Sequence, residues 1–596
     1  MSWLIVAVVA YFLLAGSAVL DKVILTRPIR SSLLYATYIG LVAGYALIAL
    51  PFFFSLADFG GRWDLVLRSL ASGVLNILAM IAFYEAVKRS DVSRAAPLVG
   101  VFTAFFTFIL GSALGVEALD AFEIIIFIVL VGGAMLLIRS HVELVAVLAA
   151  FLLSISIILI KSVYQNADFL SAFLTARSGD FLTGLALAVF FGKKLNLKEN
   201  WQSLRGKTLG WLGFLKVVVG SGLLVQHYAI FLGSAILVQA LSGLQYFFVW
   251  LIVAVVAAIW KSLPREKFPI GTIIVLLGLF LLAFSGRPVE LTPGVKSWGV
   301  TFSKLFADQL GIDWRGAYGT LLDDLKVRKI RLPVYWSEVE RSPGVYDFRD
   351  YDFLVERAGE RGAKLVLVVG RRLPRWPECH IPPWAEKLGG TEQQEKVLEF
   401  VKTAVERYRR HGFIEAWQVE NEPFLKEFGL CPEPDPEFLD RQIGLVKSLD
   451  SRPVIITDSG EIGSWLGSAR RADIFGTTMF GVVWRDEFPS GYVRYPSMPS
   501  LYYFKTNFAK IFAGLKDVIV SELQAEPWGP GMIYELTPDE QQKSMNLKQF
   551  RKNIKLAEGV GFREAYLWGA EWWFKEKLEG RPEIWEEARR LFTETK

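Results

Sequence analysis

Ten apolar runs, each long enough to cross a lipid bilayer, fill the first half of this 596-residue chain. A spanning helix needs about 20 mainly apolar residues. The runs lie at about 3–20, 32–55, 66–86, 95–116, 121–138, 144–163, 169–191, 209–231, 235–259 and 269–286. They are apolar all round and show no polar stripe, which argues against ten amphipathic helices of a water-soluble domain. No basic segment precedes the first run and no obvious cleavage site follows it, so we expect a retained helix.

Charge divides the chain in two. Residues 1–290 hold 21 Lys and Arg against 14 Asp and Glu, whereas 291–596 hold 44 against 46. Neither half has the basic excess of a nucleic-acid-binding protein. Since 596 residues also exceed the size of one domain, we predict a membrane domain over 1–287, a linker over 288–295 and a second domain over 296–596. The expected partner of the first domain is the lipid bilayer.

The membrane domain shows an internal repeat. The stretch from Tyr84 aligns weakly with the stretch from Tyr228, at an offset of 144 residues. The alignment predicts two repeats, about 1–140 and 142–287, with five helices each. Repeats with an odd number of helices have inverted topology.

A motif accompanies the repeat: Pro97 opens an apolar run that ends near the acid Glu117. In this the half-chain resembles the drug/metabolite transporter superfamily of the ten-helix EamA type. The second repeat departs from the pattern, with Leu241 in place of the proline. The resemblance implies a transporter-like bundle whose substrate site lies between the repeats, and a homodimer through this domain is a further expectation.

Some charged residues fall inside apolar runs. Arg177 and Asp180 are spaced i, i+3, so they can pair on one helix face, and Lys216 lies in the next run. Charges inside a membrane usually face a cavity or a partner. They therefore indicate either a polar transport path or a set of interhelical hydrogen bonds that holds the bundle together.

Basic residues in the loops predict the orientation. Loops after odd-numbered runs hold 15 Lys and Arg, and loops after even-numbered runs hold 3 when Arg68 and Lys161 at their edges are counted. Basic loops stay cytoplasmic, so a multi-pass protein of the cell membrane with both termini and the second domain outside the cytoplasm is expected. Ten-helix relatives are thought to keep both termini inside. The predicted orientation rests on the charge count, because the count is a property of this chain itself.

Eight strand-like runs alternate with charged helices in the second half. They read WGVTF, KIRLPVYW, KLVLVVG, IEAWQVENE, RPVIITD, DIFGTTMF, DVIVSELQ and REAYLWGA. This alternation is typical of an α/β fold, and eight units indicate a (β/α)₈ TIM barrel. The predicted fold is therefore multi-domain, with an all-α ten-helix transmembrane bundle followed by the barrel.

Two of the strand-like runs end in carboxylic acids. The fourth closes on Asn421-Glu422-Pro423, and the seventh contains Glu522. Here the sequence resembles clan A of the glycoside hydrolases, which includes family 5 cellulase-like and family 42 galactosidase-like enzymes. The match implies that Glu422 is the acid/base, Asn421 binds the sugar 2-hydroxyl and Glu522 is the nucleophile.

Further residues match the clan or suit sugar binding. Arg331 fits the strand-two arginine that keeps the nucleophile ionised, and Trp568 fits the tryptophan under the sugar. Three more tryptophans in the predicted upper loops are candidate sugar-binding residues: Trp336, Trp376 and Trp528. Strand three ends in Gly370-Arg371-Arg372, without the histidine of many family 5 members. No clear tyrosine orients the nucleophile, although Tyr492 or Tyr495 could substitute.

The chain has only two cysteines, Cys379 and Cys431, which follow the third and fourth runs. Neighbouring strands of a barrel place their loops side by side, so the sulfurs could meet. An exterior location would permit a disulfide, and two separate thiols are the alternative. The four histidines are scattered, so we expect no metal site and no cofactor.

These features favour a membrane-anchored retaining glycoside hydrolase. Its substrate would be a β-linked oligosaccharide, polysaccharide or glycoconjugate. The membrane domain would then serve as an anchor, or it would move the released sugar or a lipid-linked glycan. The alternative is a metabolite or sugar transporter that carries a non-catalytic glycan-binding barrel.

Overall fold

The computed structural model divides the chain into two compact units, Met1–Ala283 and Phe284–Lys596. It describes residues 2–26, 31–89, 92–137, 143–197, 207–259 and 270–594. The division falls close to residue 287, where the hydropathy pattern predicts the end of the membrane domain.

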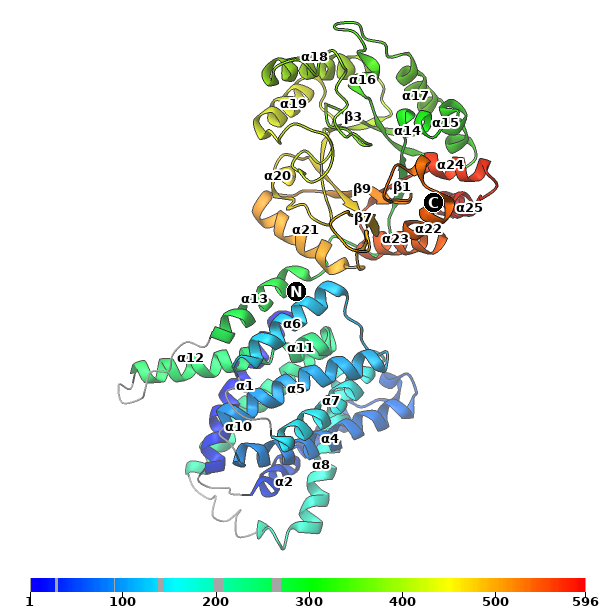
Figure 1. Ribbon diagram of the computed structural model, residues 1–596. Coiled ribbons are helices and arrows are strands. Elements are labelled where there is room, and N and C mark those ends of the chain that lie inside the picture. The colour runs from blue at the N-terminus through cyan, green and yellow to red at the C-terminus, as the bar shows by residue number, and fades with distance from the viewer. Residues whose placement is uncertain are drawn as a thin grey trace. The chain divides into compact units, whose positions relative to one another are not determined.

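The described part of the first unit consists of helices (Figure 1). Its helices are α1 (Ser2–Thr26), α2 (Ser32–Val42), α3 (Tyr45–Phe53), η1 (Leu56–Phe59), α4 (Trp63–Arg89), α5 (Val92–Ala113), α6 (Ala121–Met135), α7 (Leu144–Tyr164), α8 (Phe169–Phe191), α10 (Lys207–Leu232), α11 (Ala235–Ala240), α12 (Gly243–Ile259) and α13 (Ile270–Ser285).

Two of the ten apolar runs are broken in the structure. The run at 32–55 is divided into α2 and α3, and the run at 235–259 into α11 and α12. By length and composition, five helical segments of the described residues could cross a membrane: Ser32–Phe53, Trp63–Arg89, Leu144–Tyr164, Phe169–Phe191 and Ala235–Ile252. Four shorter apolar helices accompany them: Trp3–Ala18, Pro97–Ala113, Ala121–Met135 and Ile270–Ser285. The count of ten spans stays a prediction.

Glycines bring α8 close to its neighbours. A Cβ on Gly73 of α4 would lie 2.0 Å from the carbonyl oxygen of Ala176, and a Cβ on Gly40 of α2 would lie 2.7 Å from the Cα of Gly184. Both contacts are impossible for any larger residue. Small residues at helix crossings are typical of bundles in lipid, where van der Waals packing holds the helices together.

The acid of the transporter-like motif has a structural role. Glu117 accepts hydrogen bonds from the backbone N–H groups of Ala235 (3.0 Å) and Ile236 (3.2 Å), at the start of α11. It also accepts from the Ser234 hydroxyl at 3.2 Å and pairs with the Lys161 ammonium at 3.2 Å. Lys161 in turn donates to the carbonyl oxygen of Ile230 at 2.9 Å. This buried pair joins α7 to both sides of the α10–α11 turn.

The second unit is built on a closed barrel of eight parallel strands, in the order β1-β10-β9-β6-β5-β4-β3-β2. Every strand-like run of the sequence becomes one of them. The strands are β1 (Ser297–Thr301), β2 (Lys329–Pro333), β3 (Lys364–Val369), β4 (Ile414–Val419), β5 (Val454–Asp458), β6 (Ile474–Met479), β9 (Val518–Gln524) and β10 (Glu564–Trp568). A separate hairpin, β7 (Val482–Trp484) and β8 (Tyr492–Arg494), follows β6.

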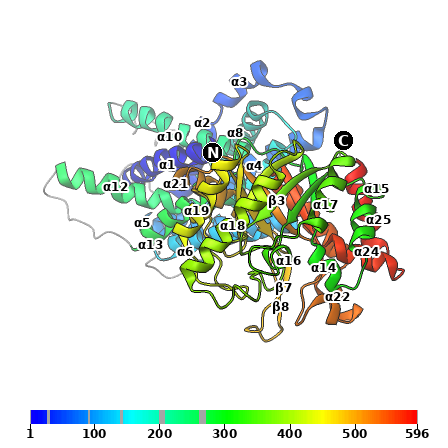
Figure 2. The ribbon, with the colours of Figure 1, turned by 90° about the horizontal axis from the view of Figure 1, so that it is seen from above.

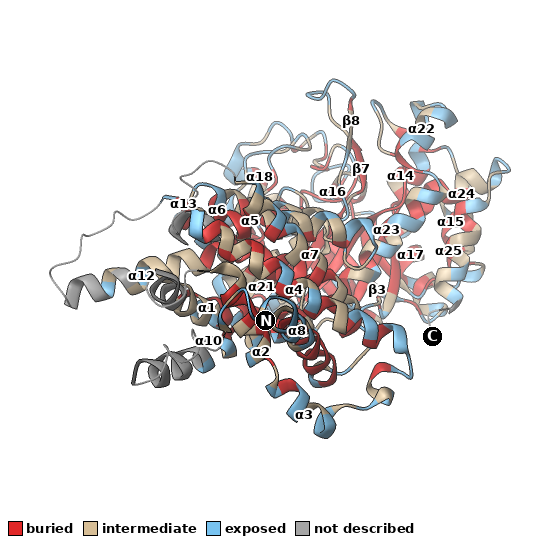
Figure 3. Cartoon of the chain, turned by 90° about the horizontal axis from the view of Figure 1, so that it is seen from below, coloured by how far each residue is buried: buried red, intermediate tan, exposed pale blue. Residues whose placement is uncertain are grey.

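Helices surround the strands (Figures 1 and 2). They are α14 (Lys304–Gln309), α15 (Trp314–Asp323), α16 (Trp336–Val339), α17 (Arg349–Glu360), α18 (Gly390–Tyr408), α19 (Pro436–Leu449), α20 (Leu466–Ala469), α21 (Pro499–Ala513), η2 (Ile533–Glu535), α22 (Pro538–Ser544), α23 (Leu547–Val560), α24 (Ala570–Leu578) and α25 (Glu583–Glu594). Helices such as α17 and α23 carry buried residues along one side and exposed residues along the other (Figure 3).

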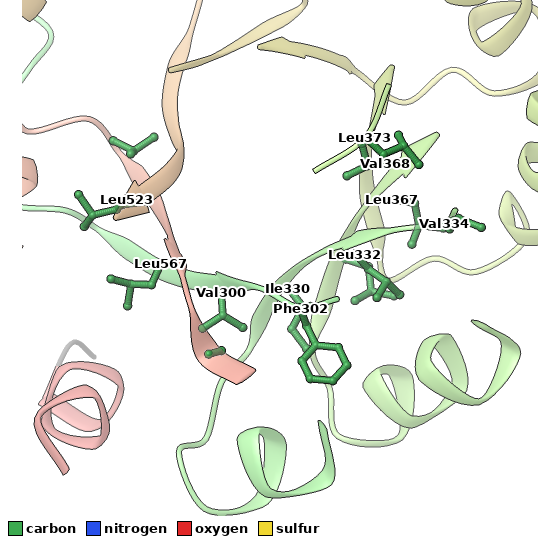
Figure 4. Close-up of a cluster of buried hydrophobic side chains, with 14 of the residues drawn as sticks. Val300, Phe302, Ile330, Leu332, Val334, Leu367, Val368, Leu373, Leu523 and Leu567 are labelled. Carbon is green, nitrogen blue, oxygen red and sulfur yellow. The ribbon is translucent and has the colours of Figure 1, made fainter. Parts of the chain in front are cut away.

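Alternation along the strands separates two cores. Outward side chains such as Ile330, Leu332 and Leu367 pack against the helices (Figure 4). Inward side chains form a small apolar cluster in the middle of the barrel: Val366, Ala416, Ile455, Ile519 and Tyr566. Further along the same inward faces come polar residues: Arg331, Gln418, Thr457 and Ser521. The inward-facing polar residues therefore lie toward the carboxyl ends of the strands, as in other barrels of this kind.

Candidate active site

A buried arginine stands at the centre of the candidate site. Arg331, on β2, is 1% exposed. Its Nη1 donates to Oε1 of Glu522 at 2.9 Å, and its Nη2 donates to Oδ1 of Asn421 at 2.7 Å. Its Nε donates to Oε1 of Gln418 at 2.7 Å. The arginine predicted from strand two thus joins the ends of β4 and β9.

Glu422 follows β4 in a conformation that L residues rarely adopt. Its φ is 45°, and Glu420 has a φ of 58°. The Glu422 backbone N–H donates to Oγ1 of Thr457 at 2.8 Å, and that hydroxyl donates to Oδ1 of Asn421 at 3.2 Å. Positive φ at a non-glycine residue costs free energy and is concentrated at functional sites.

The surroundings of Glu422 favour its protonated form. Burial, followed by the negative charges of Glu522, Glu378 and Asp458, raises the pKa of Glu422 well above its ordinary value. Burial and neighbouring carboxylates both favour the neutral form of a carboxyl group. The site therefore combines Glu422, whose protonated form is favoured, with Glu522, which is paired with Arg331. Such a pair can donate a proton and supply a nucleophile in one reaction.

A third carboxyl group, Glu378, was missed in the sequence. It is 4% exposed and lies in the loop after β3. The Asn421 Nδ2 donates to its Oε2 at 3.4 Å. Burial and then the charge of Glu522 raise the pKa of Glu378 to about 8. Its position next to Cys379 was the available signal, because the predicted disulfide would carry this glutamate toward the loop after β4.

The predicted sugar-binding tryptophans lie in different environments. Trp376 is 38% exposed, and its ring lies 5.7 Å from Phe428, which lies 5.2 Å from Trp528. Trp528 also contacts Phe480 at 5.3 Å. These four rings form an aromatic row, Trp376–Phe428–Trp528–Phe480, along the loops after β3, β4, β6 and β9.

The other two tryptophans are covered by protein. Trp336 is fully buried between Trp384 and Phe400, so it has no face for a sugar, and its assignment to substrate binding was wrong. It belongs to the core because α16 turns it toward α18. Trp568 is 7% exposed, and the Arg375 guanidinium lies 4.0 Å from its ring centre. One face of the predicted sugar platform is therefore occupied.

Other acids near the strand ends bind protein groups. Glu420 accepts hydrogen bonds from the backbone N–H groups of Arg371 (3.0 Å) and Arg372. Asp458 accepts from the Trp465 backbone at 3.0 Å. Tyr492 donates to Glu540 at 2.9 Å, so its hydroxyl does not orient the nucleophile.

The structure joins Cys379 and Cys431 in a disulfide, with their Cα atoms 5.3 Å apart. The bond connects the loop that carries Trp376 and Glu378 to the loop after Glu422. The Leu430 backbone N–H also donates to the carbonyl oxygen of Pro377 at 2.9 Å. The two loops therefore form one braced wall beside the carboxyl groups.

In the first unit, Arg177 and Asp180 form the predicted ion pair on α8, and both are buried. The Asn76 side chain of α4 donates to Oδ1 of Asp180 at 3.2 Å. This contact is an interhelical hydrogen bond. The side chain of Lys216 lies outside the described residues.

In the part of the chain that the structure describes, no group of three or more His, Cys, Asp or Glu side chains could hold a metal ion.

No family model matches this chain, and no curated protein matches its sequence. Similar solved structures are glycoside hydrolases. A β-glucosidase from Exiguobacterium marinum is 14% identical, with a TM-score of 0.31 over 43% of this chain and 76% of its own. A GH5_18 protein from Streptomyces cattleya, in complex with GlcNAc, is 14% identical, with a TM-score of 0.34 over 46% and 71%. The exo-β-1,4-mannosidase Op5Man5 from Opitutaceae bacterium strain TAV5 is 16% identical, with a TM-score of 0.32 over 50% and 60%. These scores are too low to carry a conclusion about activity.

Replacing Glu522 by glutamine is expected to lower the pKa of Glu422, because the negative charge of Glu522 contributes to raising it. The measurement is an infrared titration of protonated carboxyl groups in the full-length protein, with the Glu422→Gln variant identifying the band. Glu433→Gln, at an exposed acid, is the matched control. An unchanged titration midpoint in Glu522→Gln would show that the two groups do not interact.

Proposed function

We propose that the second unit is a retaining glycoside hydrolase that cleaves a β-linked glycan by double displacement. One observation carries the proposal: Arg331 binds both Glu522 and Asn421 beside Glu422, a buried carboxyl whose pKa is raised. An acid and a nucleophile on opposing strand ends are the two groups that this reaction needs.

In the first step, Glu522 attacks the anomeric carbon while Glu422 gives its proton to the leaving oxygen. The glycosidic C–O bond breaks, a glycosyl–Glu522 ester forms and the alcohol departs. Arg331 stabilises the Glu522 carboxylate before attack. Because Arg331 also holds Oδ1 of Asn421, the Asn421 Nδ2 is directed away from the guanidinium and toward Glu378.

In the second step, Glu422 acts as a base. It removes a proton from water as the water oxygen attacks the same anomeric carbon. The ester bond breaks, Glu522 returns to its carboxylate form and Glu422 is protonated again. Two inversions at one carbon give overall retention. The aromatic row offers apolar ring faces for further sugar units, which suits an oligosaccharide, polysaccharide or glycoconjugate substrate.

Glu522→Ala is expected to lower the turnover rate by about 10⁴–10⁶-fold, as loss of a covalent catalytic group does. Azide, which fits the space left by the side chain, is expected to restore cleavage of an activated aryl glycoside with an inverted product. Product configuration is measured by NMR on the full-length protein in detergent. Glu433→Ala, the same change at a surface acid, is the control. An inverted wild-type product, or full activity of Glu522→Ala, would contradict the mechanism.

We propose that the first unit spans the cell membrane as a transporter-like domain. Large apolar side chains are widely exposed on its surface, including Ile48 (75%), Phe52 (81%), Leu144 (83%) and Phe190 (80%). Patches of this kind on a helical unit suit contact with lipid. The buried pair Arg177–Asp180 favours a transport role, since charges inside a membrane usually belong to a functional site. The moved solute would be the sugar that the barrel releases, or a lipid-linked glycan.

Neutralising both charges together, in Arg177→Met/Asp180→Asn, is expected to abolish sugar uptake into proteoliposomes while barrel hydrolysis continues. Each single change leaves one buried charge unpaired, which costs about 3–5 kcal/mol, so the double variant is the informative one. Normal uptake by a correctly inserted double variant would assign the pair to helix packing alone.

The barrel is proposed to lie outside the cytoplasm, because 15 of the 18 basic loop residues follow odd-numbered runs. A disulfide in the same unit suits an oxidising compartment. Added protease is expected to digest the barrel in right-side-out vesicles and to leave it intact in inside-out vesicles. The reverse pattern would place the barrel in the cytoplasm.

A further inference from the structure

Glu378 is a buried carboxyl group that the proposed mechanism does not use. Its φ of 71° is unusual for a residue with a side chain. Its backbone is fixed on both sides, since its N–H donates to Arg375 O and its carbonyl accepts from Leu373 N, each at 2.7 Å. A Cβ on Gly429 would lie 2.7 Å from the Glu378 Cβ, so a glycine is needed opposite it. The loop thus holds this glutamate in a defined place.

The carboxyl groups of the site outnumber the positive charges that contact them. Among the residues that the structure describes, neither Glu378 nor Glu422 forms an ion pair, whereas Glu522 is paired with Arg331. Arg372, the other nearby cation, donates its Nη1 to the carbonyl oxygen of Leu425 at 2.7 Å and its Nη2 to that of Phe428 at 2.8 Å. With Glu422 protonated for catalysis, Glu378 is the carboxyl group for which the chain provides no contacting cation.

The hydrogen bonds of Asn421 show where Glu378 lies relative to the substrate. Oδ1 of Asn421 accepts from Arg331, so its Nδ2 faces the opposite way and donates to Glu378 at 3.4 Å. Under the proposed function, Asn421 adjoins C2 of the sugar that is cleaved. The carboxyl group of Glu378 therefore lies near C2 of that sugar. A substituent at C2 would meet oxygen acceptors on two sides, from Glu378 and from Glu522.

An ammonium group fits this position better than a hydroxyl group. It has three N–H donors, carries the missing positive charge and needs no donor from the protein. We propose that Glu378 is a specificity-determining residue that binds an ammonium group at C2, so that the barrel prefers β-linked 2-amino-2-deoxy sugars. This proposal rests on the proposed hydrolase function. Burial and the charge of Glu522 raise the pKa of Glu378 to about 8, and a bound ammonium group would lower it by supplying the opposite charge.

The test compares aryl β-glycosides that differ only at C2, as free amine, hydroxyl or acetamide, in the gluco, galacto and manno series. The full-length wild type in detergent is expected to favour the amine. A charge-assisted hydrogen bond corresponds to about 10–100-fold in kcat/KM. Glu378→Gln, which keeps the shape and removes the charge, is expected to lower the ratio of kcat/KM for the amine substrate to that for the hydroxyl substrate by the same factor. Glu433→Gln is the matched control.

The outcomes separate this proposal from the hydrolase assignment. Equal rates for amine and hydroxyl substrates, or a preference for the acetamide, would overturn the role of Glu378 while the hydrolase stands. An equal loss for all substrates in Glu378→Gln would assign Glu378 to positioning Asn421 and would also overturn it.

If Glu378→Gln folds poorly, a second measurement on the wild type tests the proposal. It compares the inhibition constant of the free amino sugar with that of the matching neutral sugar. Equal inhibition overturns the proposal. Failure of the wild type to cleave any substrate would overturn both.

Discussion

The pairing of Arg331 is the constraint on which the rest of the barrel top depends. A guanidinium carries five N–H donors and cannot give up its charge, and this one is almost fully buried. Its acceptors include Thr301 of β1, Asn421 just after β4 and Glu522 of β9. Leaving a buried charge unpaired costs several kcal/mol. The barrel is therefore expected to close with the ends of these strands in one arrangement.

That arrangement gives each carboxyl group a different environment. Glu522 faces the guanidinium, whereas Glu422 and Glu378 lie in the same buried space without a contacting cation among the described residues. Burial disfavours the charged form, and a neighbouring carboxylate disfavours it further. The pKa values of Glu422 and Glu378 are thereby raised, whereas Glu522 has a guanidinium partner.

The walls of the site are held by contacts between loops. The disulfide and the Leu430–Pro377 hydrogen bond join the loops after β3 and β4. The wall continues through edge-on and tilted ring contacts among Trp376, Phe428, Trp528 and Phe480. A disulfide removes conformational freedom from the unfolded chain, so a braced wall keeps Glu378 in place at a smaller entropic cost.

Local pattern in the sequence determined the eight strands and the apolar helices, and it indicated that Glu422 and Glu522 lie at strand ends. A strand's alternation and a helix's apolar surface are properties of neighbouring residues, which the chain displays directly. Tertiary structure alone decided that Glu378 joins the site, that Trp336 turns into the core and that Arg375 covers one face of Trp568. It also divided two apolar runs into four helices. These outcomes depend on which distant loops and helices come into contact in the folded chain. The sequence of one segment does not specify those contacts.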